Sequence, residues 1–224
     1  MSKKDFAERV LEARLDKLIL DLDFCLFDTD SMRRPLGPVF ERFFSGHDFF
    51  SRLEMKGLID QAWSTAPHDL VKRLEMPDAL ALTFLDFYRG LQVPAEAVLY
   101  ADVQECLTAL QARRAKMFLV SKGIESFQAA KVAHCDIGEF FAEVVYVGPD
   151  SARAIKREAM QDIFSRHRLN PADVWVVGDS KDELSAGQAL DATTVQTLRP
   201  GIKRQPAHHH VTDLHELVKL LQGR

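Results

Sequence analysis

The sequence predicts an α/β fold, a doubly wound parallel sheet with an inserted helical cap domain. From Val103 onward, short apolar segments alternate with amphipathic helical segments. Such alternation is typical of a parallel sheet covered by helices on both faces. Residues 33–94 contain no convincing strand pattern, which favours a small helical domain of their own. We therefore expect an α/β core of residues 1–32 and 95–224 and a helical cap of residues 33–94.

Composition narrows the class of protein. The chain has 224 residues, a formal net charge of −4 and a pI near 6.1, which argues against a surface that binds nucleic acid or anionic lipid. No apolar run approaches the roughly 20 residues that a membrane span needs. We therefore expect a small-molecule partner, with no nucleic acid and no membrane, and the sequence leaves the oligomeric state open.

The N-terminus and the cysteines favour a cytoplasmic protein. The first 17 residues are too charged for a secretion signal, and they read as an amphipathic helix. The three cysteines have neither close pairing nor zinc-site spacing, so we interpret them as reduced thiols. The apolar side of that helix comprises Phe6, Val10, Leu11 and Leu15, and the cysteines are Cys25, Cys106 and Cys135.

The N-terminal half contains one strand followed by helices. Lys17–Leu22 is a short apolar run that we expect to be the first strand of the sheet. Asp28–Pro38 is polar and contains Pro and Gly, so we expect a flap or linker. Val39–Gly90 has helical periodicity throughout, and prolines at 67, 77 and 94 stand where helices should start or stop.

The C-terminal half alternates regularly between the two element types. Buried-type apolar runs predict the strands, and the 3.6-residue period predicts the helices between them. In chain order we expect helix Val103–Arg113, strand Lys116–Val120, helix Ile124–His134, strand Glu143–Val147, helix Lys156–Arg168, strand Asp173–Val177, helix Asp182–Leu190 and strand Thr193–Leu198. The run His208–His210 predicts a short edge strand or loop, because consecutive histidines in a strand point apart and make a poor metal site.

Two carboxylates follow the first strand. Asp21 and Asp23 are separated by one residue, so in an extended chain both side chains project from the same face. Two acids that point together at the end of a buried strand repel each other, and desolvation increases the cost. A divalent cation is the obvious candidate to neutralise them.

Polar residues also follow the later strands. Ligands of open α/β sheets bind beyond the carboxyl ends of the strands, so these residues should meet there. The second strand leads to Ser121, Lys122 and Gly123; the third is followed by Lys156; and the fourth leads to Asp179, with Asp182 and Glu183 on the next helix.

This set of residue types suits phosphoryl transfer. Mg²⁺ prefers carboxylate oxygens, which Asp21 and Asp179 would supply. An aspartate can be the nucleophile, and a second acid two residues later is placed for proton transfer. Lys156 and the Ser121 hydroxyl can bind phosphoryl oxygens. The backbone N–H groups of Lys122 and Gly123, near a helix start, can add further donors.

The segments DLDFCLFDTD, LVSKG and VVGDSKDE, with Lys156 between the last two, resemble the four ordered motifs of the haloacid dehalogenase-like (HAD) hydrolase superfamily. The resemblance spans about Leu18 to Pro200, and the helical segment stands where α-helical, C1-type caps occur in that superfamily. It implies a catalytic set of Asp21, Asp23, Ser121 and Lys156, a phosphate-binding set of Ser121, Lys122, Gly123 and Lys156, and a Mg²⁺ site of Asp21, the Asp23 main-chain carbonyl, Asp179 and Glu183.

Two features of the motifs distinguish this chain. The superfamily usually has Gly and then Thr or Val after the second Asp, where this chain has Phe24 and Cys25. The last motif usually closes with Asp, where this chain has Glu183, with Asp182 one place earlier. Either could hold a metal-bound water, and the alignment favours Glu183.

The second aspartate of the first motif discriminates among reactions. Carbon–halogen-cleaving relatives lack an acid at the position of Asp23, whereas phosphatases and phosphomutases keep it. We therefore expect Mg²⁺-dependent hydrolysis of a small phosphate monoester through an aspartyl-phosphate intermediate on Asp21. Two alternatives remain open: a phosphomutase of the same superfamily, and a non-catalytic binding or regulatory protein with this fold.

Overall fold

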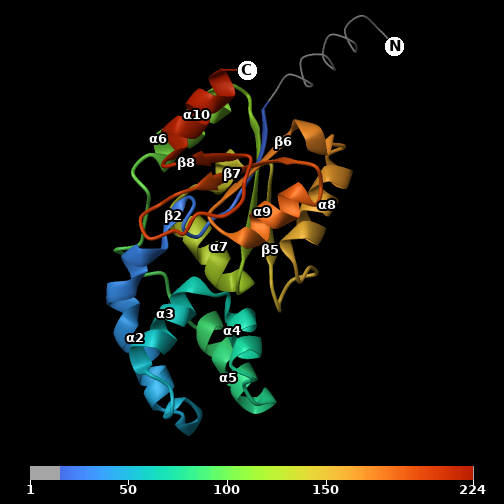
Figure 1. Cartoon of the computed structure of the whole chain (residues 1–224). Coiled ribbons are helices and arrows are strands. Elements are labelled where there is room, and N and C mark those ends of the chain that lie inside the picture. Colours follow the sequence, from blue (N-terminus) through green and yellow to red (C-terminus); the bar gives the residue numbers. More distant parts are fainter. Residues whose placement is uncertain (1–15, 224) are drawn as a thin grey trace, which may run out of the picture.

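The computed structural model describes residues 16–223 and has the α/β fold expected from the sequence (Figure 1). Its centre is a six-stranded sheet with the order β5-β4-β1-β6-β7-β8, in which all neighbouring strands are parallel. The N-terminal helix predicted from Phe6 to Leu15 lies outside the described residues. Among residues 16–223, every helix is too short or too polar to cross a membrane.

Six strands form the main sheet. Their bounds are β1 Lys17–Leu20, β4 Lys116–Lys122, β5 Glu143–Val147, β6 Val174–Gly178, β7 Thr193–Thr197 and β8 His209–Val211. β1 lies between β4 and β6, with Leu20 opposite Leu119 and Val177. The first strand along the chain is therefore central in the sheet, and its carboxyl end opens beside the ends of β4 and β6.

Helices cover both faces of the sheet, as the doubly wound prediction requires. Leu18 and Leu20 face a buried cluster shared with α6 (Val103–Ala112), α7 (Glu125–His134) and α10 (Leu214–Gln222). Ile19, between them, faces a second cluster shared with α8 (Lys156–Arg166) and α9 (Lys181–Gln188). Alternate residues of one strand thus enter opposite apolar layers.

The strands and helices predicted for the α/β part are present, but several bounds differ. β1 ends at Leu20 rather than Leu22, because the backbone turns there: the Leu22 carbonyl accepts hydrogen bonds from the N–H groups of Leu26 and Phe27, both at 2.9 Å. β4 continues to Lys122, two residues beyond the predicted end. The sequence analysis also omitted α10 and a two-stranded antiparallel sheet of β2 (Phe27–Asp28) and β3 (Val98–Leu99).

The segment between β2 and β3 is helical and extends from one end of the sheet (Figure 1). It contains α2 (Arg33–Ser45), α3 (Met55–Ser64), α4 (Pro67–Arg73) and α5 (Asp78–Arg89). Residues 33–94 of this segment are called the helical insertion below. Pro67 is at the start of α4 and Pro77 precedes α5, as predicted.

The expected flap or linker at Asp28–Pro38 is wrong, because most of this segment is helical. A 3₁₀ turn occupies Thr29–Met32, and α2 begins at Arg33 with Pro38 inside it. A proline within a helix removes one backbone hydrogen bond. The buried side chains Leu36, Phe40 and Phe44 anchor this helix along one face, and their burial outweighs the missing bond.

Aromatic side chains form the interior of the helical insertion. Phe40 is fully buried, with its ring centroid 5.0 Å from that of Trp63 and 5.4 Å from that of Tyr88. The Tyr88 hydroxyl donates to the Ala62 carbonyl at 2.9 Å, so this buried polar group is satisfied. The cluster continues through Met32 and Phe27 into the apolar layer of the sheet. The insertion therefore shares one continuous core with the sheet.

A buried ion pair fixes the loop that follows β1. Arg199 donates two hydrogen bonds to the Asp102 carboxylate at 2.8 and 2.9 Å, and two more to the Cys25 carbonyl at 2.9 and 3.2 Å. Its guanidinium also lies over the Tyr100 ring, 4.2 Å from the centroid. Asp102 accepts a further bond from the Leu214 N–H at 2.7 Å. This network holds the segments around Asp102, Arg199 and Leu214 against the loop of residues 22–27.

We predict that Arg199→Met destabilises the protein by about 3–5 kcal/mol, because it leaves the buried Asp102 carboxylate without its counter-charge. The double variant Arg199→Met, Asp102→Leu should recover part of this loss, since no unpaired charge then remains. Urea unfolding followed by circular dichroism measures both values. Equal stability of Arg199→Met and the unmodified protein would contradict a structural role for this pair.

Candidate active site

A cavity of about 420 Å³ lies between the carboxyl end of the sheet and the helical insertion. Its polar floor includes Asp21, Asp23, Lys156 and Asp179. The helical insertion contributes apolar walls through Phe40, Ala62, Trp63, Pro67 and Tyr88, and it also contributes the polar side chains Ser64, Thr65, Asp69 and Arg73. Another wall comes from α7, with Phe127, Gln128 and Lys131. Polar and apolar side chains thus both line a cavity of a size typical of small-molecule sites.

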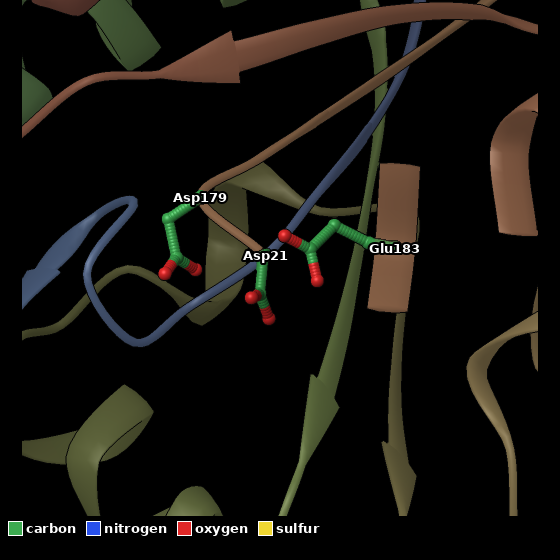
Figure 2. A group of neighbouring side chains, drawn as sticks. All are labelled: Asp21, Asp179 and Glu183. Atoms are coloured by element: carbon green, nitrogen blue, oxygen red, sulfur yellow. The ribbon is translucent and has the colours of Figure 1, made fainter. Parts of the chain in front are cut away.

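Three acidic residues from two distant segments of the chain meet at the floor. Asp21 follows β1, Asp179 follows β6 and Glu183 is in the first turn of α9 (Figure 2). One carboxylate oxygen of each lies within 4.8 Å of those of the other two. Sequence reasoning predicted this convergence, because parallel strands end at a common edge.

Lys156 supplies positive charge to this acidic cluster. Its Nζ lies 2.8 Å from Asp21 Oδ1 and 3.0 Å from Glu183 Oε2, and the residue is only 3% exposed. Burial alone would lower the pKa of Lys156, but the Asp21 and Glu183 charges outweigh it and raise this pKa above its ordinary value. The ammonium therefore stays charged. The predicted lysine points into the site and not into solvent.

The last motif places Glu183 in the cluster and Asp182 outside it. The Ser180 N–H donates to Glu183 Oε1 and the Asp182 N–H donates to Ser180 Oγ, which together form a capping box at the start of α9. Ser180 Oγ also donates to Glu183 Oε2 at 2.8 Å. Asp182 instead pairs with Lys122 at 2.9 Å. Both Glu183 oxygens are thus occupied by protein donors, so a role in holding a metal-bound water stays a proposal.

The cluster carries more negative charge than one lysine neutralises. Burial and the neighbouring Glu183 charge raise the pKa of Asp21 to about 7, although Lys156 opposes this rise. Burial, together with the charges of Glu183 and Asp21, raises the pKa of Asp179 well above its ordinary value. A group of hard carboxylate oxygens with excess negative charge fits a divalent cation such as Mg²⁺. The donor set therefore agrees with the expected metal.

Asp23 has a different environment from Asp21. Lys131 Nζ lies 2.8 and 3.1 Å from its two carboxylate oxygens, Gln128 Nε2 donates to Oδ2 at 2.7 Å, and the Thr29 hydroxyl donates to Oδ1 at 2.8 Å. Burial would raise the pKa of Asp23, but the Lys131 charge and these hydrogen bonds outweigh burial and lower it. The Asp23 carboxylate thus has its own cation in Lys131, and a divalent ion shared by Asp21 and Asp23 stays a prediction.

Ser121 is fully buried near the end of β4, next to the cavity-lining residues Lys122 and Gln128. Gln128 Nε2 donates to its hydroxyl oxygen at 2.6 Å. The Gly123 N–H, expected to be a free donor to phosphate, instead donates to the Val147 carbonyl at 2.9 Å, because β4 pairs with β5 up to this point. The Gly123 N–H is therefore not free to bind phosphate, and the expectation that it would do so is wrong. The Lys122 ammonium reaches Asp182 and, 2.7 Å away on α4, Asp69.

Phe24 occupies the position where the sequence departs from the expected glycine. Its φ is +54°, a left-handed conformation that costs a non-glycine residue about 1–2 kcal/mol. The Phe24 N–H donates to the Phe27 carbonyl at 3.0 Å, which holds the turn, and the residue lines the cavity. The backbone thus keeps a glycine-type turn, while a ring replaces the open space that glycine would leave.

Sequence reasoning missed Gln128, Lys131 and Thr29. Gln128 and Lys131 are three residues apart on α7, so both side chains lie on the same face of that helix. The available signal was polar residues at helical spacing on a helix that directly follows a motif-bearing strand. Each of the three, taken singly, resembles an ordinary surface residue in the sequence.

The comparison with protein families identifies one family. Residues 5–191 match the family described as haloacid dehalogenase-like hydrolase. No curated protein matches the sequence.

Solved structures with the same fold have low sequence identity to this chain. A HAD phosphatase from Thermococcus onnurineus is 20% identical, with a TM-score of 0.68 over 94% of this chain and 99% of that one. A haloacid dehalogenase-like family hydrolase from Streptococcus pneumoniae is 14% identical, with a TM-score of 0.72 over 93% and 99%. The L-2-haloacid dehalogenase of Xanthobacter autotrophicus is 14% identical, with a TM-score of 0.59 over 93% and 99%. These structures share the fold across nearly the whole chain.

We predict that Mg²⁺ stabilises the protein more at pH 8 than at pH 5.5. A proton on Asp21, whose pKa is raised to about 7, must leave before the carboxylate can bind metal, so affinity should be roughly 30-fold weaker at pH 5.5 from this group alone. The same shift makes the metal-free protein less stable as pH rises from about 4 to 7, because the folded state holds a proton that the unfolded chain has released.

Thermal unfolding with MgCl₂ and with EDTA at the two pH values measures this difference. Asp179→Asn, which removes one carboxylate of the cluster, is the control and should abolish the Mg²⁺-dependent shift in melting temperature at both pH values. A shift that is equal at pH 5.5 and pH 8 in the unmodified protein would contradict metal binding by Asp21.

Proposed function

The chain belongs to the haloacid dehalogenase-like hydrolase family, and we propose that within this family it hydrolyses a small phosphate monoester with the help of Mg²⁺. The observation that supports this most strongly is the joint placement of Asp21, Asp23 and Lys156 around one cavity. Asp23 is decisive among them, because the cleavage of a carbon–halogen bond leaves no alkoxide that needs a proton. A phosphate ester does release such an oxygen.

Asp21 is the proposed nucleophile. Its carboxylate would form a bond to phosphorus while the bond between phosphorus and the ester oxygen breaks, which leaves the phosphoryl group on Asp21. Lys156 lies 2.8 Å from Asp21 Oδ1, so its positive charge is available to the transferring phosphoryl oxygens. Ser121 would donate its hydroxyl hydrogen to one of them. These contributions come from residues fixed by the sheet before substrate arrives.

The metal would be held by Asp21, Asp179 and the Asp23 main-chain carbonyl, with Glu183 completing the acidic surroundings. When bound, Mg²⁺ supplies charge that neutralises phosphoryl oxygens. The fold brings one oxygen of each carboxylate within 4.8 Å of the others, close enough for the three residues to share one ion.

Asp23 is the proposed proton carrier. It would give a proton to the leaving oxygen in the first step and take one from water in the second. The pairing with Lys131 favours the carboxylate that the second step needs. For the first step, a phosphate dianion in the cavity adds like charge beside Asp23, which raises the pKa of its carboxyl group.

The helical insertion is the proposed cap, and its side chains would set the substrate. Its Phe40, Trp63 and Tyr88 form an apolar wall opposite the acidic floor, so they would exclude water from the phosphoryl group. The cavity of about 420 Å³ suits a metabolite and not a polymer. A cytoplasmic location is proposed because Cys25, Cys106 and Cys135 are all free.

We predict that the protein releases nitrophenol from p-nitrophenyl phosphate in the presence of Mg²⁺ and that EDTA abolishes this activity. Asp21→Asn should reduce kcat by a factor on the order of 10³ or more, because the nucleophile is lost. Asp191→Asn changes an exposed aspartate after α9 and serves as the matched control. Absorbance of the released nitrophenol gives all rates.

The alternative functions make different predictions for the same samples. Activity that survives Asp21→Asn would remove the nucleophile assignment. A phosphomutase would transfer the phosphoryl group to an added sugar phosphate faster than to water. A folded protein without activity on a broad panel of phosphate esters would favour the non-catalytic reading.

A further inference from the structure

One face of α7 lies against the proposed catalytic groups. Gln128 and Lys131 are three residues apart on this helix, and they are 2% and 4% exposed. Neither residue belongs to the four motifs that resemble those of the HAD superfamily. Burying a lysine and an amide is costly unless each finds partners, so their contacts identify what this face of the helix does.

Lys131 is directed at Asp23 by its surroundings. Its Nζ reaches both carboxylate oxygens of Asp23, at 2.8 and 3.1 Å. The same ammonium lies over the rings of Phe127 and Phe27, 4.8 and 5.4 Å from their centroids. Two aromatic faces and one carboxylate leave the lysine little freedom to turn elsewhere.

Gln128 connects Asp23 with Ser121. Its Nε2 is 2.7 Å from Asp23 Oδ2 and 2.6 Å from Ser121 Oγ, and more distantly 3.4 Å from the Lys122 carbonyl. The carboxylate and the carbonyl can only accept, so the amide nitrogen must face them. With its oxygen accepting from Gln128, Ser121 keeps its own hydrogen for another acceptor, such as a phosphoryl oxygen.

We propose that Gln128 and Lys131 are positioning residues, which together orient the Asp23 carboxylate for proton transfer to the leaving group and the Ser121 hydroxyl for donation to phosphate. This inference rests on the proposed function. We call the pair the α7 clamp. It acts through Asp23 and Ser121 and contacts no reacting bond itself.

The leaving group reveals the role of Asp23. When the bond between phosphorus and the ester oxygen breaks, that oxygen receives the proton of Asp23, and the phosphoryl group stays on Asp21. Nitrophenolate is a weak base and leaves without a proton, whereas phenolate is a stronger base and needs one. If the Asp23 carboxyl group is turned away from the leaving oxygen, hydrolysis of phenyl phosphate should therefore slow far more than hydrolysis of p-nitrophenyl phosphate.

The ratio of the two kcat/KM values separates positioning from general damage. kcat/KM reports the steps up to release of the leaving group, so a change in the ratio reflects proton transfer to that group. A variant that merely loosens the fold or reduces the active fraction lowers both values equally. The two esters also have nearly the same shape, so contacts between substrate and the helical insertion affect both kcat/KM values equally and cancel in their ratio.

We predict that Lys131→Met lowers kcat/KM about 100-fold for phenyl phosphate and less than about fivefold for p-nitrophenyl phosphate. Lys116→Met is the matched control, because Lys116 also lies over a ring, 5.7 Å from the Phe118 centroid, at the opposite end of β4. It should change neither value by more than about twofold. Equal losses for the two esters in Lys131→Met would overturn the proposal.

A double-variant cycle tests whether the clamp acts through Asp23. In an Asp23→Asn background, Lys131→Met should leave the ratio of the two esters unchanged, because the group that it orients is gone. A further change in this background would show that Lys131 acts on the leaving group independently, which also contradicts the proposal.

Gln128→Glu tests the role of Gln128 in the α7 clamp. It also provides a second test of the proposal if Lys131→Met does not fold. Glutamate has the same shape but cannot donate, and its charge repels Asp23. We expect the same change in ester ratio and, in addition, an inhibition constant for inorganic phosphate about tenfold higher, because Ser121 loses its orientation. Lys131→Met should leave that inhibition constant within about twofold. An unchanged constant in Gln128→Glu contradicts the Ser121 assignment.

Crystal structures of Lys131→Met and of the unmodified protein test whether Lys131 positions the Asp23 carboxylate, and this test needs no activity measurement. The proposal requires the Asp23 side chain to leave its observed position in the variant, and an unmoved carboxylate refutes it. Should the unmodified protein hydrolyse neither ester, the proposed function fails separately, and this structural comparison still tests the clamp.

Discussion

Mutual repulsion among four acidic side chains at the carboxyl end of the central strands is the main physical constraint on this fold. These acids come from two distant segments of the chain, Asp21 and Asp23 after β1 and Asp179 and Glu183 after β6. Concentrating such charge away from water is costly unless opposite charge or hydrogen-bond donors accompany it. Lys156 serves Asp21 and Glu183, whereas Lys131 serves Asp23. The excess charge near Asp179 is what a divalent cation would neutralise.

The fold and the centre of the site could be predicted because both follow from local pattern and from the geometry of parallel sheets. Alternating apolar and amphipathic segments predicted the doubly wound sheet, which the structure confirms. Asp21, Lys156 and Asp179 follow separate strands, and a parallel sheet brings such positions to one edge whatever the intervening sequence. The choice of Glu183 over Asp182 came from the resemblance to a family and agrees with where the two side chains lie.

The remaining features depend on contacts between distant residues, which periodicity does not encode. β1 was predicted to reach Leu22, but the Leu22 carbonyl bonds a turn instead. The Gly123 N–H looked free because the β4–β5 pairing that occupies it links residues 24 positions apart in sequence, Gly123 and Val147. Lys131 is 108 residues from Asp23, and only the packing of α7 against the end of β4 brings them together. These three misses concern contacts between distant residues, whereas the flap or linker expected at Asp28–Pro38 was a wrong element type.

Among the described residues, two ion pairs join the helical insertion to the α/β part: Lys122 with Asp69, and Arg89 with Asp150. All four side chains are 18–37% exposed. Pairs with such access to water contribute only about 0–1 kcal/mol each, and salt weakens them further. Electrostatic resistance to separating the two parts is thus comparable with thermal energy. The attachment of the insertion therefore depends mainly on the apolar core that it shares with the sheet through Met32 and Phe40, and added salt should do little to loosen it.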